Sequence, residues 1–151
     1  MMIYNNGLEI LFNGIFAAIT AQVLKLVGYL VRYRKFDFKI LTTTGGMPSS
    51  HSAGVIGMAT TAGIIDGFTS TVFAVALGFS LVVMYDAAGV RRSAGKIATV
   101  LNRIKEDIYS HKPELIGEKL KELLGHTPFE VFVGAILGLV LAYFNHYILL
   151  I

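Results

Sequence analysis

Four long apolar stretches divide the chain, and shorter polar segments separate them. They extend over about residues 8–31, 48–65, 68–88 and 129–151. A helix needs roughly 20 mainly apolar residues to cross the hydrocarbon core of a bilayer, so each stretch is long enough, or nearly so, to span a membrane. The pattern predicts an all-α fold, a polytopic membrane helix bundle with four transmembrane spans in a single domain.

The second stretch differs from the others because it is short and rich in glycine and alanine. Small residues allow helices to approach each other closely in lipid. We therefore expect this span to lie inside the bundle. Gly134 and Gly138 offer a similar close-approach face on the last span.

The positive charges are distributed unevenly along the chain and predict its orientation. Of the 13 Lys and Arg residues, Lys25 lies inside the first stretch, and the others all fall in residues 32–47 and 89–128. Loops rich in Lys and Arg remain in the cytoplasm. We therefore expect a multi-pass protein of the cell membrane with both of these loops in the cytoplasm and both termini outside.

The long third connection carries two helical patterns of its own. In the first, apolar residues recur at helical spacing opposite polar ones; in the second, leucines dominate and Gly125 is a plausible stop. Both amphipathic helices are suited either to the membrane interface or to a soluble cap over the bundle. The apolar positions are Ile97, Val100, Leu101, Ile104 and Ile108, then Leu115, Ile116, Leu120, Leu123 and Leu124. The polar face opposite the first set consists of Lys96, Asn102, Arg103, Lys105 and Glu106.

Composition agrees with a membrane-embedded chain. Of the 151 residues, 54% are hydrophobic and 15% are charged, and the mean hydropathy is +0.65. An ordinary soluble domain has about a quarter of its residues charged. The chain contains no cysteine, which excludes disulfides and thiolate metal sites. We expect membrane lipids as partners and no nucleic acid.

The segment from Gly45 to Ser52 is the strongest candidate for chemistry. It reads Gly-Gly-Met-Pro-Ser-Ser-His-Ser and precedes an apolar run. Glycines such as Gly46 allow backbone N–H groups to converge, and a helix N-terminus adds partial positive charge. With the hydroxyls of Ser49 and Ser50 and a proton-transfer group in His51, the segment fits a phosphate. The alternative is that Ser49 or Ser50 only caps a helix.

A second histidine opens the last span. His126 and Glu130 are four residues apart, so they share one helix face if both lie in a helix. A carboxylate there orients an imidazole and stabilises its charged form, which suits a nucleophile or a base. The alternative is a solvated pair at the membrane interface. His111 and His146 are expected to be ordinary surface or interface residues.

Cationic side chains complete the candidate set. Arg91 and Arg92 follow the third span and are able to clamp phosphoryl oxygens, with Asp86 as a partner that orients one of them. Lys25 and Arg32 are seven apart and share a helix face. The alternative for the arginines is that they only anchor the ends of the spans at the membrane surface. Lys25 lies deep enough to need a partner or an aqueous cleft.

These motifs resemble the type 2 phosphatidic acid phosphatase superfamily, which includes the vanadium-dependent haloperoxidases, and most closely its divergent small membrane branch. Lys25-x6-Arg32 is similar to the first motif, with Tyr33 in place of proline. Pro48-Ser49-Ser50-His51 is similar to the second, with serine for glycine. His126-x3-Glu130 is similar to the end of the third, with glutamate for aspartate. Leu120 stands where the third motif has arginine, and Arg91 or Arg92 is the candidate substitute.

The resemblance implies a lipid phosphatase that acts on a phosphate monoester or diphosphate without metal or cofactor. In that scheme His126 attacks phosphorus, Glu130 orients it, and His51 protonates the leaving oxygen. Lys25, Arg32, Arg91 or Arg92 and the loop amides bind the phosphate. The substrate is then a phospholipid or an isoprenoid phosphate.

Two other functions stay open at this stage. Because the expected arginine is missing, a non-catalytic lipid-phosphate binding or carrier protein is one alternative. A metal-dependent phosphotransferase is another, but such sites need several clustered aspartates, and only Asp86 and Glu130 are available on the last two spans. A homo-oligomer also stays open, since a partner chain would cover the glycine-lined faces.

Overall fold

The computed structural model describes residues 6–36, 38, 40, 45–109, 120 and 125–149, and all its long elements are helices. In chain order they are α1 (Gly7–Tyr33), α2 (Ser50–Asp66), α3 (Thr71–Ala88), α4 (Val90–Ile108) and α5 (Pro128–Phe144), and α5 continues into a short π-helix η3 (Asn145–Leu149). The predicted all-α fold is confirmed.

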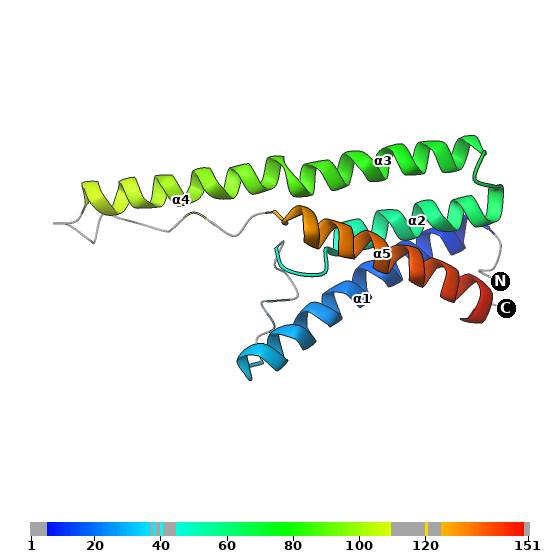
Figure 1. Ribbon diagram of the computed structural model, residues 1–151, viewed down its shortest axis with the longest axis horizontal. Helices are drawn as coiled ribbons and strands as arrows, with labels where there is room; N and C mark the ends of the chain where they lie inside the picture. The colour runs from blue at the N-terminus through cyan, green and yellow to red at the C-terminus, as the bar shows by residue number, and fades with distance from the viewer. Residues whose placement is uncertain are drawn as a thin grey trace.

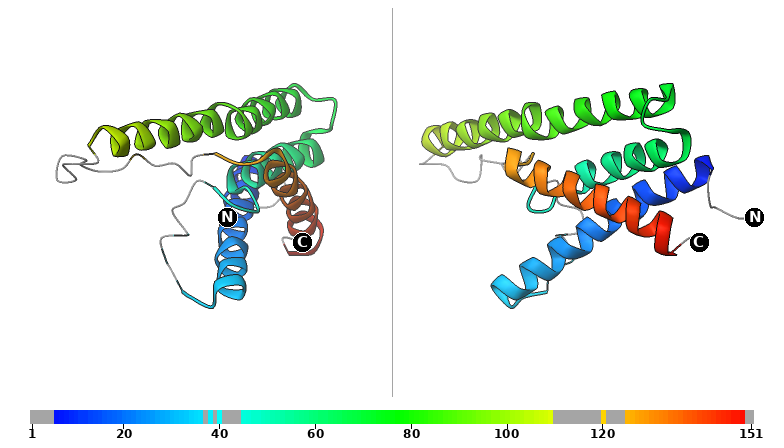
Figure 2. Two further views of the ribbon diagram at one scale, coloured as in Figure 1. Left: turned by 60° about the vertical axis from the view of Figure 1, so that its left-hand side comes forward. Right: turned by 45° about the vertical axis from the view of Figure 1, so that its right-hand side comes forward.

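Helix α2 is the centre of the bundle, and α1, α3 and α5 all pack against it. Figure 1 shows α3 running beside α2, while α1 and α5 cross the other side of α2. The second half of α1 leaves the bundle, as the right-hand view of Figure 2 also shows. With 17 residues α2 is short, and most of it is buried, as its small residues predict.

Three helices in the described part of the chain are long and apolar enough to cross a membrane. They are Gly7–Tyr33, the continuous run Thr71–Ile108 and Pro128–Ile148. Their outward faces expose large apolar side chains such as Ile19, Val75 and Phe132. Such a surface suits lipid rather than water, and the chain is accordingly a helical membrane protein.

Glycines set how closely the helices pack. A Cβ on Gly134 would overlap the backbone of Ser49, and one on Gly138 would overlap the backbone of Ala53. Gly54 lies close to α1, although less tightly: a Cβ added there would be 3.2 Å from the Gly14 carbonyl oxygen. The backbone of α2 is therefore in near contact with α5 and α1, which is the packing that small residues allow in membranes.

A set of polar side chains is buried where the start of α1 meets the end of α5. His146 Nδ1 lies 2.6 Å from Glu9 Oε1, and neither side chain is exposed beyond 7%. One turn deeper, Asn145 Nδ2 donates to Asn13 Oδ1 (2.8 Å) and Asn13 Nδ2 donates to Thr61 Oγ1 (2.9 Å). The prediction that His146 is an ordinary surface or interface residue is wrong, because the π-helix turns it inward to Glu9.

The third connection agrees in part with its predicted helices. α4 forms the first of them, and its apolar stripe is exposed. Asn102, predicted on the polar face, is instead buried, where its amide donates to Leu120 O (2.9 Å) and accepts from Leu120 N (3.0 Å). The second predicted amphipathic helix and His111 lie outside the described residues, apart from Leu120.

The close packing of α5 on α2 gives a stability prediction. We expect Gly138→Ala to lower the free energy of unfolding by about 1–3 kcal/mol, because the new methyl group would meet backbone atoms that cannot rotate away. The matched control is Gly78→Ala on α3, where nothing lies within 4 Å of the added Cβ. Denaturant unfolding in mixed micelles measures both, and equal stability of the two variants would contradict this account of the packing.

Candidate functional site

The candidate site lies where the first turns of α2 and α5 meet the end of α3. Ser49 N donates to Glu130 O (3.2 Å), which ties the start of α2 to the first turn of α5. His126 N donates to Ala87 O (2.9 Å), which fixes the residues before α5 on the end of α3. Three segments that are far apart in the sequence therefore converge on His126.

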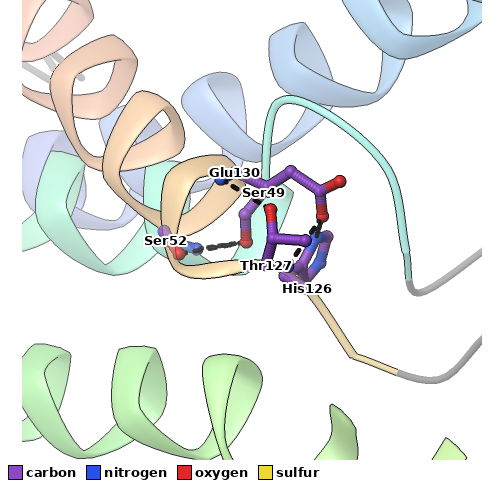
Figure 3. Close-up of polar contacts among 5 residues, drawn as sticks. All are labelled: Ser49, Ser52, His126, Thr127 and Glu130. Carbon is purple, nitrogen blue, oxygen red and sulfur yellow. Dashed lines mark hydrogen bonds and ion pairs between the residues drawn. The ribbon is translucent and has the colours of Figure 1, made fainter.

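His126 and Glu130 are in contact, but His126 precedes the N-cap Thr127, so the two residues do not share a helix face as their spacing predicted. His126 Nδ1 lies 3.2 Å from Glu130 Oε2 (Figure 3). An ionised carboxylate can only accept a hydrogen bond, so it holds the imidazole as the tautomer with its proton on Nδ1. The other ring nitrogen, Nε2, is buried and has no hydrogen-bond partner in the described part of the chain. In this tautomer Nε2 carries a lone pair.

Glu130 also stabilises the start of its own helix. Its Oε2 accepts from Thr127 N (3.1 Å), while Thr127 Oγ1 accepts from Glu130 N (3.3 Å). This reciprocal pair is a capping box, visible in Figure 3. Because one carboxylate oxygen accepts from both Thr127 N and His126 Nδ1, the cap fixes the position of the histidine. The pattern Thr-Pro-Phe-Glu in the sequence signals this box, although it was not among the predicted features.

The two predicted histidines lie side by side. The ring centroids of His51 and His126 are 6.4 Å apart, with the rings inclined at 66°. His51, in the first turn of α2, is exposed, whereas His126 is 2% exposed. A group bound at the exposed ring of His51 is thus next to the buried ring of His126.

Ser49 caps helix α2, which was the alternative to phosphate binding in the sequence analysis. It is the N-cap of α2, and its Oγ accepts from Ser52 N (3.3 Å) and Ser52 Oγ (3.0 Å). The side chain is fully buried. Ser50 is also buried, in the first turn of the helix. Whether either hydroxyl contacts a ligand stays a prediction.

Lys25 and Arg32 line one cavity of about 800 Å³, between the second half of α1 and the start of α5. Gly46, Thr127 and Glu130 form part of the opposite wall. Gly46 has φ +88°, a backbone conformation that favours glycine, and a Cβ there would lie 3.5 Å from Lys25 Cδ. Although Lys25 is only 6% exposed, it therefore lines a cleft, which is one of the two environments, a partner or an aqueous cleft, that its depth in the first span predicts.

The acidic and basic residues at the junction of α3 and α4 separate into two groups. Arg91 Nε donates to Asp86 Oδ2 (2.6 Å), so Asp86 orients Arg91. The charged side chains of Arg91, Asp86 and Lys25 all lie within electrostatic range of the His51 ring. Arg92 contributes to the junction through its backbone, against which Gly125 packs. Of the two arginines, Arg91 is therefore the one whose charged side chain is held near the His51 ring.

The charge state of His126 follows from its surroundings. Burial lowers the pKa of His126, and the positive charge of Lys25 acts in the same direction. The hydrogen bond and the negative charge of Glu130 oppose this shift, and the net direction is downward. Burial disfavours the charged imidazolium, so the ring is neutral at neutral pH. The described residues contain no group of three or more His, Cys, Asp or Glu side chains that could hold a metal ion.

The fold and the site together define a helical membrane protein with two neighbouring histidines and a cation-lined cavity that Glu130, the partner of His126, also lines. A family model described as the Divergent PAP2 family matches residues 6–141. The chain therefore belongs to the Divergent PAP2 family, and the resemblance inferred from its motifs is confirmed.

A similar protein is known from Bacillus subtilis (strain 168), where it is named "Uncharacterized membrane protein YuiD". The two sequences are 43% identical over 148 residues, which cover 89% of this chain and 94% of the relative. No solved structure matches the chain. The family model thus shows the family, and the name of the relative agrees with a membrane location.

The environment of His126 gives a prediction that does not depend on activity. We expect His126 to titrate below the ordinary histidine range in NMR spectra of the protein in micelles. Lys25→Met should raise the pKa of His126, because it removes a nearby positive charge, and Glu130→Gln should lower it, because it removes a negative one. Lys96→Met, on α4, is the control and should leave it unchanged. Shifts in the opposite directions would show that the site is built differently.

Proposed function

We propose that the protein is a membrane lipid phosphatase that hydrolyses a phosphate monoester or diphosphate of a lipid through a phosphohistidine intermediate. The observation that carries this proposal is the His126 ring, which lies beside His51: its Nδ1 is held by Glu130, while its buried Nε2 has no hydrogen-bond partner among the residues that the structure describes. A neutral imidazole with one nitrogen fixed by a carboxylate is an activated nucleophile.

The proposed reaction has two steps. In the first, His126 Nε2 attacks phosphorus, the bond from phosphorus to the leaving oxygen breaks, and His51 gives that oxygen its proton. In the second, water attacks the phosphohistidine, its proton passes to His51, and the bond from nitrogen to phosphorus breaks. Inorganic phosphate leaves, and both histidines return to their starting states.

Positive charge supports the same assignment. Phosphoryl transfer depends mainly on positioning and on stabilising charge at the phosphoryl oxygens. Lys25 and Arg32 line the cavity beside Glu130, and Arg91 is held by Asp86 near His51. Arg91 is our candidate for the arginine that the third motif lacks. The lowered pKa of His126 also keeps the nucleophile neutral at the pH of the cytoplasm.

A lipid as substrate is supported by a second cavity of about 640 Å³. It begins at Ser50 and His51 and continues between α1 and α2 along mainly apolar residues as far as Met58. An acyl or isoprenoid chain in that cavity would place its phosphate at the histidines. A phospholipid and an isoprenoid phosphate share this chemistry, so both belong in the substrate panel.

Purified protein should release phosphate from phosphatidate or isoprenoid phosphates in the presence of a chelator of divalent metals. We expect His126→Ala to lower kcat/KM at least about 10³-fold and Glu130→Gln roughly 10²–10⁴-fold, as for nucleophiles and their orienting carboxylates elsewhere. Lys25→Met should weaken phosphate binding, with Lys96→Met as its matched control. Equal phosphate release by wild type and His126→Ala would refute the mechanism.

The same assay separates the enzyme from the non-catalytic alternative. A binding or carrier protein would bind vanadate or a lipid phosphate tightly, with Lys25→Met weakening that binding, yet no variant or wild-type protein would release phosphate. Leu120, six residues before His126 in place of arginine, is the observation that favours this second candidate. Binding without turnover across the lipid panel would decide for it.

We also propose that the site faces the cytoplasm, with both termini outside and the protein in the cell membrane. The Lys and Arg residues of segments 32–47 and 89–128 support this orientation through the positive-inside rule. A single cysteine placed at Arg103 should react with a membrane-impermeant maleimide only in inverted vesicles, because the wild-type chain has no cysteine. Labelling in right-side-out vesicles instead would reverse the orientation.

A further inference from the structure

Helix α4 carries an apolar stripe that the rest of the described chain does not cover. Its members are exposed, with exposed fractions of 60% for Ile97, 46% for Ile104 and 67% for Ile108. A stripe this long is costly to leave in water, so it requires a partner. The stripe consists of Val90, Ala94, Ile97, Leu101, Ile104 and Ile108.

The spacing of the stripe is that of a coiled-coil seam. Its successive steps are four, three, four, three and four residues over the full length of α4. Apolar residues that alternate in this way occupy the a and d positions of a heptad, where a left-handed coiled coil forms. With Val90, Ile97 and Ile104 at d, the charged residues of α4 all fall outside a and d.

A different face of α4 packs on its own chain. Gly95, Ala98 and Asn102 are buried, and Asn102 makes two hydrogen bonds to the backbone of Leu120. On a helical wheel of 100° per residue these positions lie roughly 120° from the centre of the stripe. The intramolecular packing that the structure describes therefore leaves the seam open.

The hydrocarbon of the bilayer does not cover the stripe either. The 18 residues of α3 are about 27 Å long, which already approaches the thickness of the hydrocarbon core. α4 continues α3 in nearly the same direction, in Figure 1 and in both views of Figure 2. Its 19 residues extend about 28 Å further, beyond the hydrocarbon.

We propose that α4 pairs with α4 of a second copy of this chain in a parallel coiled coil. Two copies inserted in the same direction have parallel α4 helices when a twofold axis runs along the membrane normal. Each stripe residue then meets its counterpart, as an isologous contact requires. Ile at d with Leu101 at a shifts the preference towards three or four strands, so the mass of the assembly gives the number of copies. This inference does not rest on the proposed phosphatase activity.

The absence of cysteine makes the test direct. Single variants Ile97→Cys, Leu101→Cys and Ile104→Cys place a thiol on the stripe, and Arg103→Cys and Glu106→Cys place one off it. Oxidation in native membranes should yield disulfide-linked dimers at the stripe positions at least about fivefold more often than at the two controls, because only a and d positions bring backbones within disulfide range. Equal yields on and off the stripe would mean random collision and would overturn the proposal.

A second measurement uses no cysteine. Light scattering of the purified protein in micelles should give the mass of two or more chains, and Leu101→Glu should reduce it to one chain, with Arg103→Glu as the control. A monomeric wild type would overturn the proposal. So would an intramolecular disulfide in the double variant Ile104→Cys/Leu123→Cys in place of dimers, since the stripe would then be covered by its own chain. Neither readout depends on phosphate release.

Discussion

The near contact between the backbones of α2 and α5 determines where every other part of the site lies. Gly134 and Gly138 allow α5 to reach the backbone of Ser49 and Ala53. Without that approach, Ser49 N would not reach Glu130 O, and the first turns of the two helices would separate. His51 and His126 are neighbours because these two turns start at the same level. The small residues of α2 therefore serve the site as much as the packing.

The site also shows how one group fulfils a structural and a chemical role together. Glu130 accepts hydrogen bonds from Thr127 N and His126 Nδ1 at the same oxygen. The capping box holds the carboxylate in place, and the carboxylate in turn holds the imidazole. A solvated pair at the interface, which was the alternative, would have no such constraint. The buried Glu9 and His146 pair at the other end of the bundle similarly joins α1 to the end of α5, but it lies apart from the cavity that Lys25 lines.

Local patterns predicted much of this molecule because their physical causes are local. Apolar run length gave the helices, small residues indicated that α2 lies inside, and the spacing of His126 and Glu130 gave their contact. Other features depended on partners far away in the sequence. His146 was predicted to be an ordinary surface or interface residue, but it is buried against Glu9, 137 residues away. Asn102 was assigned to a polar face, yet its amide is used by the backbone of Leu120.

By itself, the sequence determined the class of protein, its long apolar helices, the chemical character of each motif and the family, because these depend on composition and on the spacing of residues close together in the chain. Only the tertiary structure decided which residues meet. In the structure the ring centroids of His51 and His126 are 6.4 Å apart, Arg91 pairs with Asp86, and Ser49 is the N-cap of α2. Such choices depend on how closely helix backbones approach, a property shared by residues that are distant in the chain, so no single segment encodes it.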